Sequence, residues 1–196
     1  MAGLGADAVT VRAATDLSRH RVIDNPDWAG GMGSSFRAGV AAAAPEDHVL
    51  IALVDQPGLT AETVARMLAS HQPGRVAAAA YRGPDGNLRR GHPLLLDSSL
   101  RAEAADTATG DAGARHFLQA HPELIDLVDC SDLSGGEDLD TPGQLHLLET
   151  TTRGQIRPIW RPTMDRILPP VGSIALTPAR GPAARAAPWT GCATIA

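Results

Sequence analysis

The stretch from His48 to Pro57 reads H-V-L-I-A-L-V-D-Q-P and joins an apolar run to a polar exit. Uninterrupted apolar runs of this length are typical of parallel strands that are buried on both faces. Pro57 lacks a backbone N–H, so the strand is expected to stop before it. Asp55 is therefore expected at the carboxyl end of a central parallel strand, where ligands gather in open α/β sheets.

Strand and helix patterns alternate on both sides of this stretch. Thr60 is a suitable N-cap for the next helix, and a serine can cap the helix that starts near Ser34. Further strands are predicted around residues 9–11, 22–23, 75–81 and 125–129, and further helices over residues 98–105, 111–120 and 141–150. Short connections between alternating strands and helices predict a layered α/β fold with a mostly parallel sheet.

Composition and charge narrow the class of protein. A chain of 196 residues with 43% hydrophobic residues fits one domain with a sizeable core. All 17 basic residues are Arg, and residues 1–150 hold 11 of them against 21 Asp and Glu, a net charge of −10. An acidic body argues against nucleic acid as the main partner, because a phosphate backbone requires a basic face.

The compartment follows from what the sequence lacks. It has no stretch of about 20 apolar residues for a membrane span, and its N-terminus does not resemble a signal peptide. Cys130 and Cys192 are far apart and form neither a disulfide framework nor a metal-type pair. We therefore expect a cytoplasmic protein with no membrane partner.

The character of the chain changes after Thr150. Residues 151–196 hold 6 Arg against Asp165 and are rich in Pro, with no sustained hydrophobic period. This composition predicts that residues 1–150 form the domain and that residues 151–196 form a disordered tail.

Carboxylates mark a candidate metal site. Asp55 follows a buried strand, and alternation places Asp138 and Asp140 on one side of a short extended segment. Carboxylates from separate loops can hold Mg²⁺ on a triphosphate. A simpler reading is also open, in which Asp55 caps a turn and Asp140 or Thr141 caps the helix that begins at Pro142.

Two further loops can contact a ligand. The glycines between Asn25 and Gly39 precede a helix N-terminus, an arrangement that favours anions but is common in proteins. His92 lies in the loop Arg90-Gly91-His92-Pro93 and is either a ligand-contacting group or a surface histidine. Residues 110–115 form a polar turn, for which a helix cap with a solvated Arg115 is the simpler interpretation.

Taken in order, these motifs resemble a known family. They are N-P-D-W-A-G-G-M-G-S-S from Asn25, V-D-Q-P from Val54, G-H-P from Gly91, G-D-A-G-A-R from Gly110 and D-L-D-T-P from Asp138. Their order and spacing are similar to those of MobA-like NTP transferases, in particular the branch that includes molybdenum cofactor cytidylyltransferase. The resemblance covers residues 22–148.

The resemblance implies a three-layer, Rossmann-like nucleotidyltransferase fold. It implies transfer of a nucleotidyl group from CTP, or from GTP, to a phosphorylated pterin, with loss of pyrophosphate. It also implies that Asp55 and Asp140 are catalytic and bind Mg²⁺, with Asp138 beside them. The nucleotide and acceptor would contact Asn25, Gly31, Ser34, Ser35, Gln56, Pro57, Gly91 and His92.

One element of the family pattern has no match in this sequence. The family opens with a strand and a loop of the form L-A-A-G-x-S-x-R-x-G, followed by a Lys, and this sequence contains neither that loop nor any Lys. We therefore expect a fold that lacks its first strand and nucleotide-binding loop. The expected protein is an enzyme whose start lies upstream, or a non-catalytic relative that binds a ligand or an intact partner subunit. A molybdoenzyme is the other expected protein partner.

Overall fold

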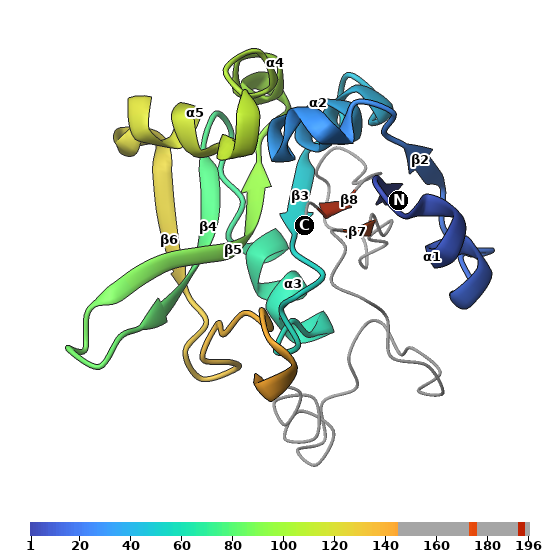
Figure 1. The fold of residues 1–196 in the computed structure, drawn as a ribbon. Coiled ribbons are helices and arrows are strands. Elements are labelled where there is room, and N and C mark those ends of the chain that lie inside the picture. Colours follow the sequence, from blue (N-terminus) through green and yellow to red (C-terminus); the bar gives the residue numbers. More distant parts are fainter. Residues whose placement is uncertain (145–172, 176–191, 195–196) are drawn as a thin grey trace.

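The computed structural model describes residues 1–144, 173–175 and 192–194 of the chain, and its strands form two sheets (Figure 1). The larger sheet has the order β6-β4-β5-β3-β8, and the smaller has the order β2-β1-β7. The strands of the larger sheet are β3 (Val49–Ala52), β4 (Val76–Arg82), β5 (Leu88–Leu96), β6 (Ile125–Asp129) and β8 (Cys192–Thr194). Those of the smaller sheet are β1 (Ala2–Leu4), β2 (Val22–Asp24) and β7 (Ser173–Ala175).

Four strands of the larger sheet run in one direction. The β3–β8 and β4–β6 pairs are parallel, whereas β5 is antiparallel to both of its neighbours, β3 and β4. Because four of the five strands share one direction, the prediction of a mostly parallel sheet is confirmed. The neighbour of β3 on one side, β5, is antiparallel to it. The cause is the tight turn after β4, where Gly86 has a φ of +76°, because a turn this short can join only antiparallel strands.

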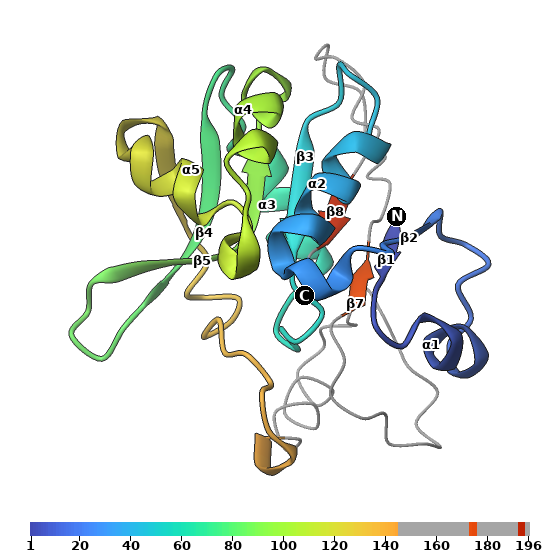
Figure 2. The ribbon, with the colours of Figure 1, turned by 45° about the horizontal axis from the view of Figure 1, so that its top comes forward.

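The helices cover both faces of the larger sheet (Figures 1 and 2). On one face lie α2 (Met32–Ala42), α4 (Arg101–Asp106) and α5 (Arg115–Ala120), and on the other lies α3 (Ala61–Ala69). The remaining helix, α1 (Ala8–Ala14), lies beside the smaller sheet. Short 3₁₀ turns occupy Trp28–Gly30, Ser98–Leu100, Gly110–Ala112, Pro122–Leu124 and Pro142–Gln144. The predicted three-layer α/β fold is confirmed.

Strand β3 shows why its sequence is apolar throughout. Val49 and Ile51 pack in the core beneath α2, α4 and α5, whereas Leu50 and Ala52 pack against α3 on the opposite face. All four side chains are at most 2% exposed. Because successive strand residues point to opposite faces, a strand covered on both sides has no position left for a polar side chain.

Two local predictions near the N-terminus were wrong. Residues 9–11 lie in α1 and not in a strand, which agrees with the high helix propensity of its three alanines; Val11 is buried, while Val9 is 82% exposed. Helix α2 begins at Met32 with Gly31 as its N-cap, and the Ser34 hydroxyl donates to the Gly31 carbonyl and so does not cap the helix. The predicted Thr60 cap is confirmed, since its hydroxyl accepts from the Thr63 N–H at 3.1 Å.

The last segments are described in part. A 3₁₀ turn begins at Pro142, and the rest of the predicted helix to residue 150 lies outside the described residues. Most of residues 151–196 also lie outside them, apart from the strands β7 and β8. No helix in the described part of the chain is long and apolar enough to cross a membrane.

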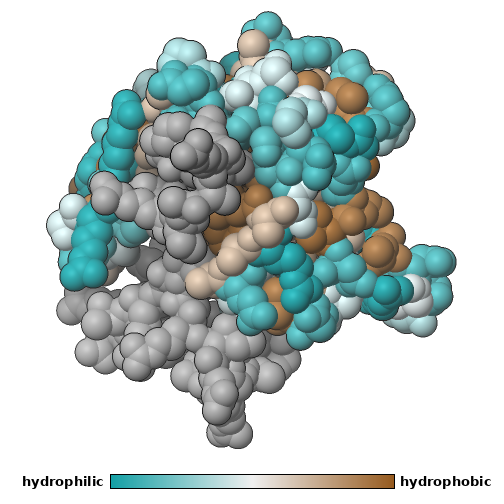
Figure 3. Space-filling view, turned by 180° about the vertical axis from the view of Figure 1, so that it is seen from behind, coloured by the Kyte–Doolittle hydropathy of each residue, from teal (hydrophilic) through white to brown (hydrophobic). Residues whose placement is uncertain are grey.

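Seen from behind, the described surface is largely hydrophilic, with apolar side chains gathered across its middle (Figure 3).

Candidate active site

The half-buried Asp55 lies in the turn that follows β3, at the carboxyl edge of the larger sheet. One of its carboxylate oxygens, Oδ1, is buried and has no hydrogen-bond partner among the described residues. An unpaired buried oxygen is costly, so a carboxylate in this condition fits a bound cation well. The geometry therefore supports the ligand reading of Asp55 over a turn cap.

The loop that carries Asp138 and Asp140 is bonded directly to the Asp55 loop. The Leu139 N–H donates to the Asp55 carbonyl at 2.7 Å, and the Gln56 side-chain amide donates to Asp138 Oδ1 at 2.9 Å. Gln56 is 5% exposed, so this side chain is fixed in the core while its amide holds an exposed carboxylate. Two segments that lie 82 residues apart in sequence are thus joined at one site.

The two neighbouring carboxylates act electrostatically on Asp55. Burial raises the pKa of Asp55, and the negative charges of Asp138 and then Asp140 raise it further. A like charge nearby disfavours ionisation, and a divalent cation between the carboxylates would remove that penalty. Oxygen donors of this kind are the ligands that Mg²⁺ and Mn²⁺ prefer. The residues present therefore fit a hard divalent cation.

The remaining residues of the D-L-D-T-P motif shape the loop. The Gln144 side-chain oxygen accepts from the backbone N–H groups of Asp140 and Thr141 at 3.0 and 2.9 Å, and from the Thr141 hydroxyl at 2.9 Å. The turn that begins at Pro142 is thus held by Gln144, and the simpler reading, in which Asp140 or Thr141 caps it, stays a prediction.

His92 lies on β5 near the carboxylates. Its backbone carbonyl accepts from the Tyr81 hydroxyl at 2.8 Å, and the peptide bond to Pro93 is cis. Burial lowers the pKa of His92 to about 4, against the opposing charge of Asp138, so the ring is neutral near pH 7. A β-carbon on Gly91 would lie 3.0 Å from the Tyr81 ring, so Gly91 permits close packing of that ring. His92 is thus a partly buried histidine, and the alternative of a surface histidine is wrong.

A second predicted group surrounds the start of α2. The Asn25 amide donates to the Ser34 and Ser35 hydroxyls, at 2.9 Å each, and Asn25 itself is 5% exposed. Gly31 has a φ of +89°, and a β-carbon there would lie 2.6 Å from the Gly110 backbone. The four residues named from the first motif are therefore brought together in one cluster with its own hydrogen bonds.

Two features of the structure were not predicted from the sequence. Asp111 Oδ1 accepts from the Met32 N–H at 3.4 Å, which places the G-D-A-G-A-R turn at the start of α2. His48, His71 and Asp97 form a partly buried cluster at the opposite edge of the sheet from Asp55. Val49 pairs with Leu96, so His48 and Asp97 stand at the next position of the same antiparallel ladder. That proximity could have been found from the register of β3 against β5.

Comparison with known proteins places this geometry in a family. Residues 3–124 match the MobA-like NTP transferase domain. A curated relative, nicotine blue oxidoreductase of Paenarthrobacter nicotinovorans, is 54% identical over 147 residues, which are 74% of this chain and 72% of the relative.

Solved structures with the same fold come from mycobacteria. The Rv0371c homolog from Mycobacterium sp. strain JC1 has a TM-score of 0.62 at 21% identity, covering 77% of this chain and 74% of that chain. Rv0371c of Mycobacterium tuberculosis H37Rv, in complex with manganese, has a TM-score of 0.59 at 23% identity, covering 74% of each chain. From the domain match over most of its length, this chain belongs to the MobA-like NTP transferase family.

Proposed function

We propose that the chain transfers a nucleotidyl group from CTP, or from GTP, to a phosphorylated pterin, with Mg²⁺ held by Asp55, Asp138 and Asp140. The observation that carries this proposal is the buried Asp55 Oδ1, which has no hydrogen-bond partner in the described part of the chain and lies in a loop bonded to that of Asp138. The family membership supports the reaction class. The pterin acceptor rests on the G-H-P and D-Q-P motifs.

The reaction requires one bond to form and one to break at phosphorus. A phosphate oxygen of the acceptor bonds to the α-phosphorus of the nucleotide, and the bond to the β-phosphate oxygen breaks, so that pyrophosphate leaves. A bound cation would neutralise charge that develops on the triphosphate oxygens. The chain contributes orientation: Gln56 fixes Asp138, and the neutral His92 ring can hydrogen-bond to the acceptor without adding charge.

A divalent cation agrees with what is described for a protein of the same fold. A protein of the same fold, Rv0371c, is described in complex with manganese. Mn²⁺ and Mg²⁺ share a preference for oxygen ligands, so that complex agrees with a divalent cation at a carboxylate site in this fold.

The same proposal includes a protein partner, either a molybdoenzyme that receives the product or a second, intact subunit.

A second candidate comes from the relative that is 54% identical and named nicotine blue oxidoreductase. Under this candidate, the chain reduces a conjugated heterocyclic dye. The two electrons and one proton would come as a hydride from a reduced nicotinamide dinucleotide, and a second proton would come from solvent. The carboxyl edge of the larger sheet, where nucleotides bind in α/β folds, would then hold a dinucleotide.

Calorimetric titration tests the first candidate. The purified chain is titrated with CTP and with GTP, each with Mg²⁺, beside Asp55→Asn and a control, Asp106→Asn, which removes an exposed carboxylate elsewhere. We expect micromolar binding that is weakened on the order of 10²–10³-fold in Asp55→Asn and unchanged in the control. Release of pyrophosphate with a phosphorylated pterin is then measured for the same three proteins.

Two outcomes would count against the first candidate. Equal binding by the wild type and Asp55→Asn would place the nucleotide away from the carboxylates. Absence of pyrophosphate release, together with bleaching of nicotine blue by NADH or NADPH, would favour the oxidoreductase.

A further inference from the structure

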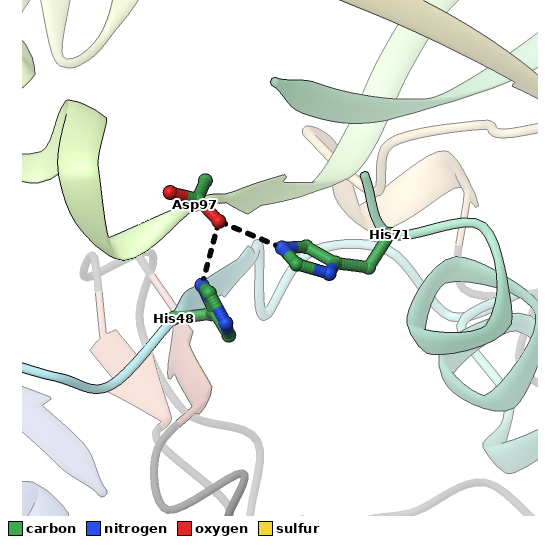
Figure 4. A group of neighbouring side chains, drawn as sticks. All are labelled: His48, His71 and Asp97. Atoms are coloured by element: carbon green, nitrogen blue, oxygen red, sulfur yellow. Dashed lines mark hydrogen bonds and ion pairs between the residues drawn. The ribbon is translucent and has the colours of Figure 1, made fainter. Parts of the chain in front are cut away.

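A second cluster lies at the amino-terminal edge of the larger sheet, away from Asp55. His48 precedes β3, His71 follows α3 and Asp97 follows β5, so three separate elements contribute one side chain each (Figure 4). Their side chains are 13%, 16% and 7% exposed, respectively. The strand β3 separates this cluster from the carboxylate site, since His48 and Asp55 flank its two ends.

The side-chain atoms of the cluster converge on a small volume. Asp97 Oδ2 lies 2.9 Å from His71 Nε2 and 3.1 Å from His48 Nδ1, and both rings point toward it (Figure 4). One ligand atom from each residue lies within 4.8 Å of the others. Ligand atoms around a tetrahedral Zn²⁺ with bonds of about 2.0 Å are about 3.3 Å apart, close to the two spacings seen here.

Surrounding hydrogen bonds orient the ligand atoms. The Ser99 N–H and hydroxyl both donate to Asp97 Oδ1, at 3.0 and 2.6 Å, which leaves Oδ2 directed at the two rings. A carboxylate held in this way by outer hydrogen bonds is a recurrent feature of metal sites. The Asp97 carboxylate is therefore oriented by the fold itself.

A hydrogen bond does not account for the short contact between His48 Nδ1 and Asp97 Oδ2. The Ser98 N–H donates to His48 Nδ1 at 2.9 Å, so Nδ1 acts as an acceptor and cannot also donate to Asp97. Two acceptor atoms, His48 Nδ1 and Asp97 Oδ2, then face each other at 3.1 Å. A cation bound between these two atoms would attract both of them. The Ser98 N–H would then no longer donate to His48 Nδ1.

We propose that His48, His71 and Asp97 bind one divalent transition-metal ion of the Zn²⁺ class. Imidazole nitrogens suit Zn²⁺ and its neighbours, whereas Mg²⁺ prefers oxygen ligands. Three protein ligands leave a fourth position for water. The bound ion ties the start of β3, the end of β5 and the chain that follows α3. This site is independent of the nucleotidyl-transfer proposal.

The first experiment is a calorimetric titration of tag-free, chelator-treated protein with zinc chloride, in the presence of excess Mg²⁺ to occupy the carboxylates. We expect one equivalent of zinc, and an affinity at least about 10-fold lower in His71→Gln and in Asp97→Asn. Two controls retain the wild-type affinity: His116→Gln, which changes an exposed histidine elsewhere, and Asp55→Asn at the other edge. Stoichiometric binding that survives His71→Gln, or no zinc binding by the wild type, overturns the proposal.

A second measurement needs no variant and holds if His71→Gln fails to fold. Histidine ring ¹⁵N resonances of the wild type are followed as zinc is added. We expect the His48 Nδ1 and His71 Nε2 resonances to shift together and to saturate at one equivalent. Shifts confined to other histidines, such as His116 or His121, overturn the proposal.

Discussion

The two edges of the larger sheet hold different sets of ligand atoms, although β3 contributes to both. At the carboxyl edge, Asp55 meets Asp138 and Asp140, and two of these three are exposed side chains on one loop. At the amino edge, His48, His71 and Asp97 are nearly buried, and outer hydrogen bonds fix Asp97. The contrast suggests that the first edge suits an exchanging cation with a substrate, and the second a permanent ion that braces the fold.

The largest expected effect separates the two edges by activity. Asp55→Asn removes a charge at the carboxyl edge and should lower nucleotidyl transfer on the order of 10²–10³-fold. Asp97→Asn should leave turnover within a few-fold of the wild type, because β3 separates it from the chemistry. Steady-state release of pyrophosphate measures both. An equal loss of activity in the two variants would mean that the edges act as one site.

The next effect is a crossed pattern in thermal stability. An ion at 100 times its Kd stabilises the folded state by about 2.7 kcal/mol, and at this chain length each kcal/mol is worth about 2–4 °C in Tm. Zinc should raise Tm in the wild type and in Asp55→Asn but not in His71→Gln. Mg²⁺ should raise Tm in His71→Gln but not in Asp55→Asn. Differential scanning calorimetry of the three proteins, in chelator and with each ion, measures these shifts, and a rise from either ion in both variants would break the assignment.

A smaller effect compares the groups that orient each carboxylate. Gln56 holds Asp138 at one edge, and Ser99 holds Asp97 at the other. Gln56→Leu should weaken Mg²⁺-nucleotide binding about 10-fold, and Ser99→Ala should weaken zinc binding about 10-fold, because outer-layer groups commonly contribute this much. Calorimetry of each variant with both ions checks the pair. If Ser99→Ala altered Mg²⁺-nucleotide binding as strongly as zinc binding, the separation of the edges would be wrong.

The same comparison shows what the sequence could predict. The site at the carboxyl edge could be predicted, because an apolar run followed by Asp55-Gln56-Pro57 indicates both a buried strand and the residue at which it ends. Asp138 was recognised as a partner from motif order, and the Gln56 amide that joins the loops agrees with it. The three layers also followed from the alternation of strands and helices.

The cluster at the amino edge could not be predicted in this way. His48 and Asp97 come together because β5 runs antiparallel to β3, whereas the apolar run of β3 predicts parallel neighbours. His71 reaches them from the connection after α3, where no local pattern marks a ligand. The N-terminal helix was missed for a different reason, because V-T-V favours a strand locally while the alanines around it favour a helix.

The smallest effect concerns the cost of keeping Asp55 ionised without a cation. Burial and the neighbouring carboxylates raise the pKa of Asp55 above its ordinary value of about 3.9. The folded state therefore binds the proton more tightly than the unfolded state. Stability is then highest below the unfolded pKa and falls as pH rises through the folded pKa. At neutral pH, in chelator, ionised Asp55 destabilises the fold.

Asp55→Asn removes this ionisation, so it should raise Tm in chelator at pH 7, and the gain should shrink as pH falls through the folded pKa of Asp55. The control Asp106→Asn should leave Tm unchanged. Saturating Mg²⁺ should reverse the order, since the wild type then gains a ligand that the variant lacks. A variant that is less stable than the wild type in chelator would mean that the Asp55 carboxylate is satisfied within the fold, and the case for a cation at the carboxyl edge would lose its main support.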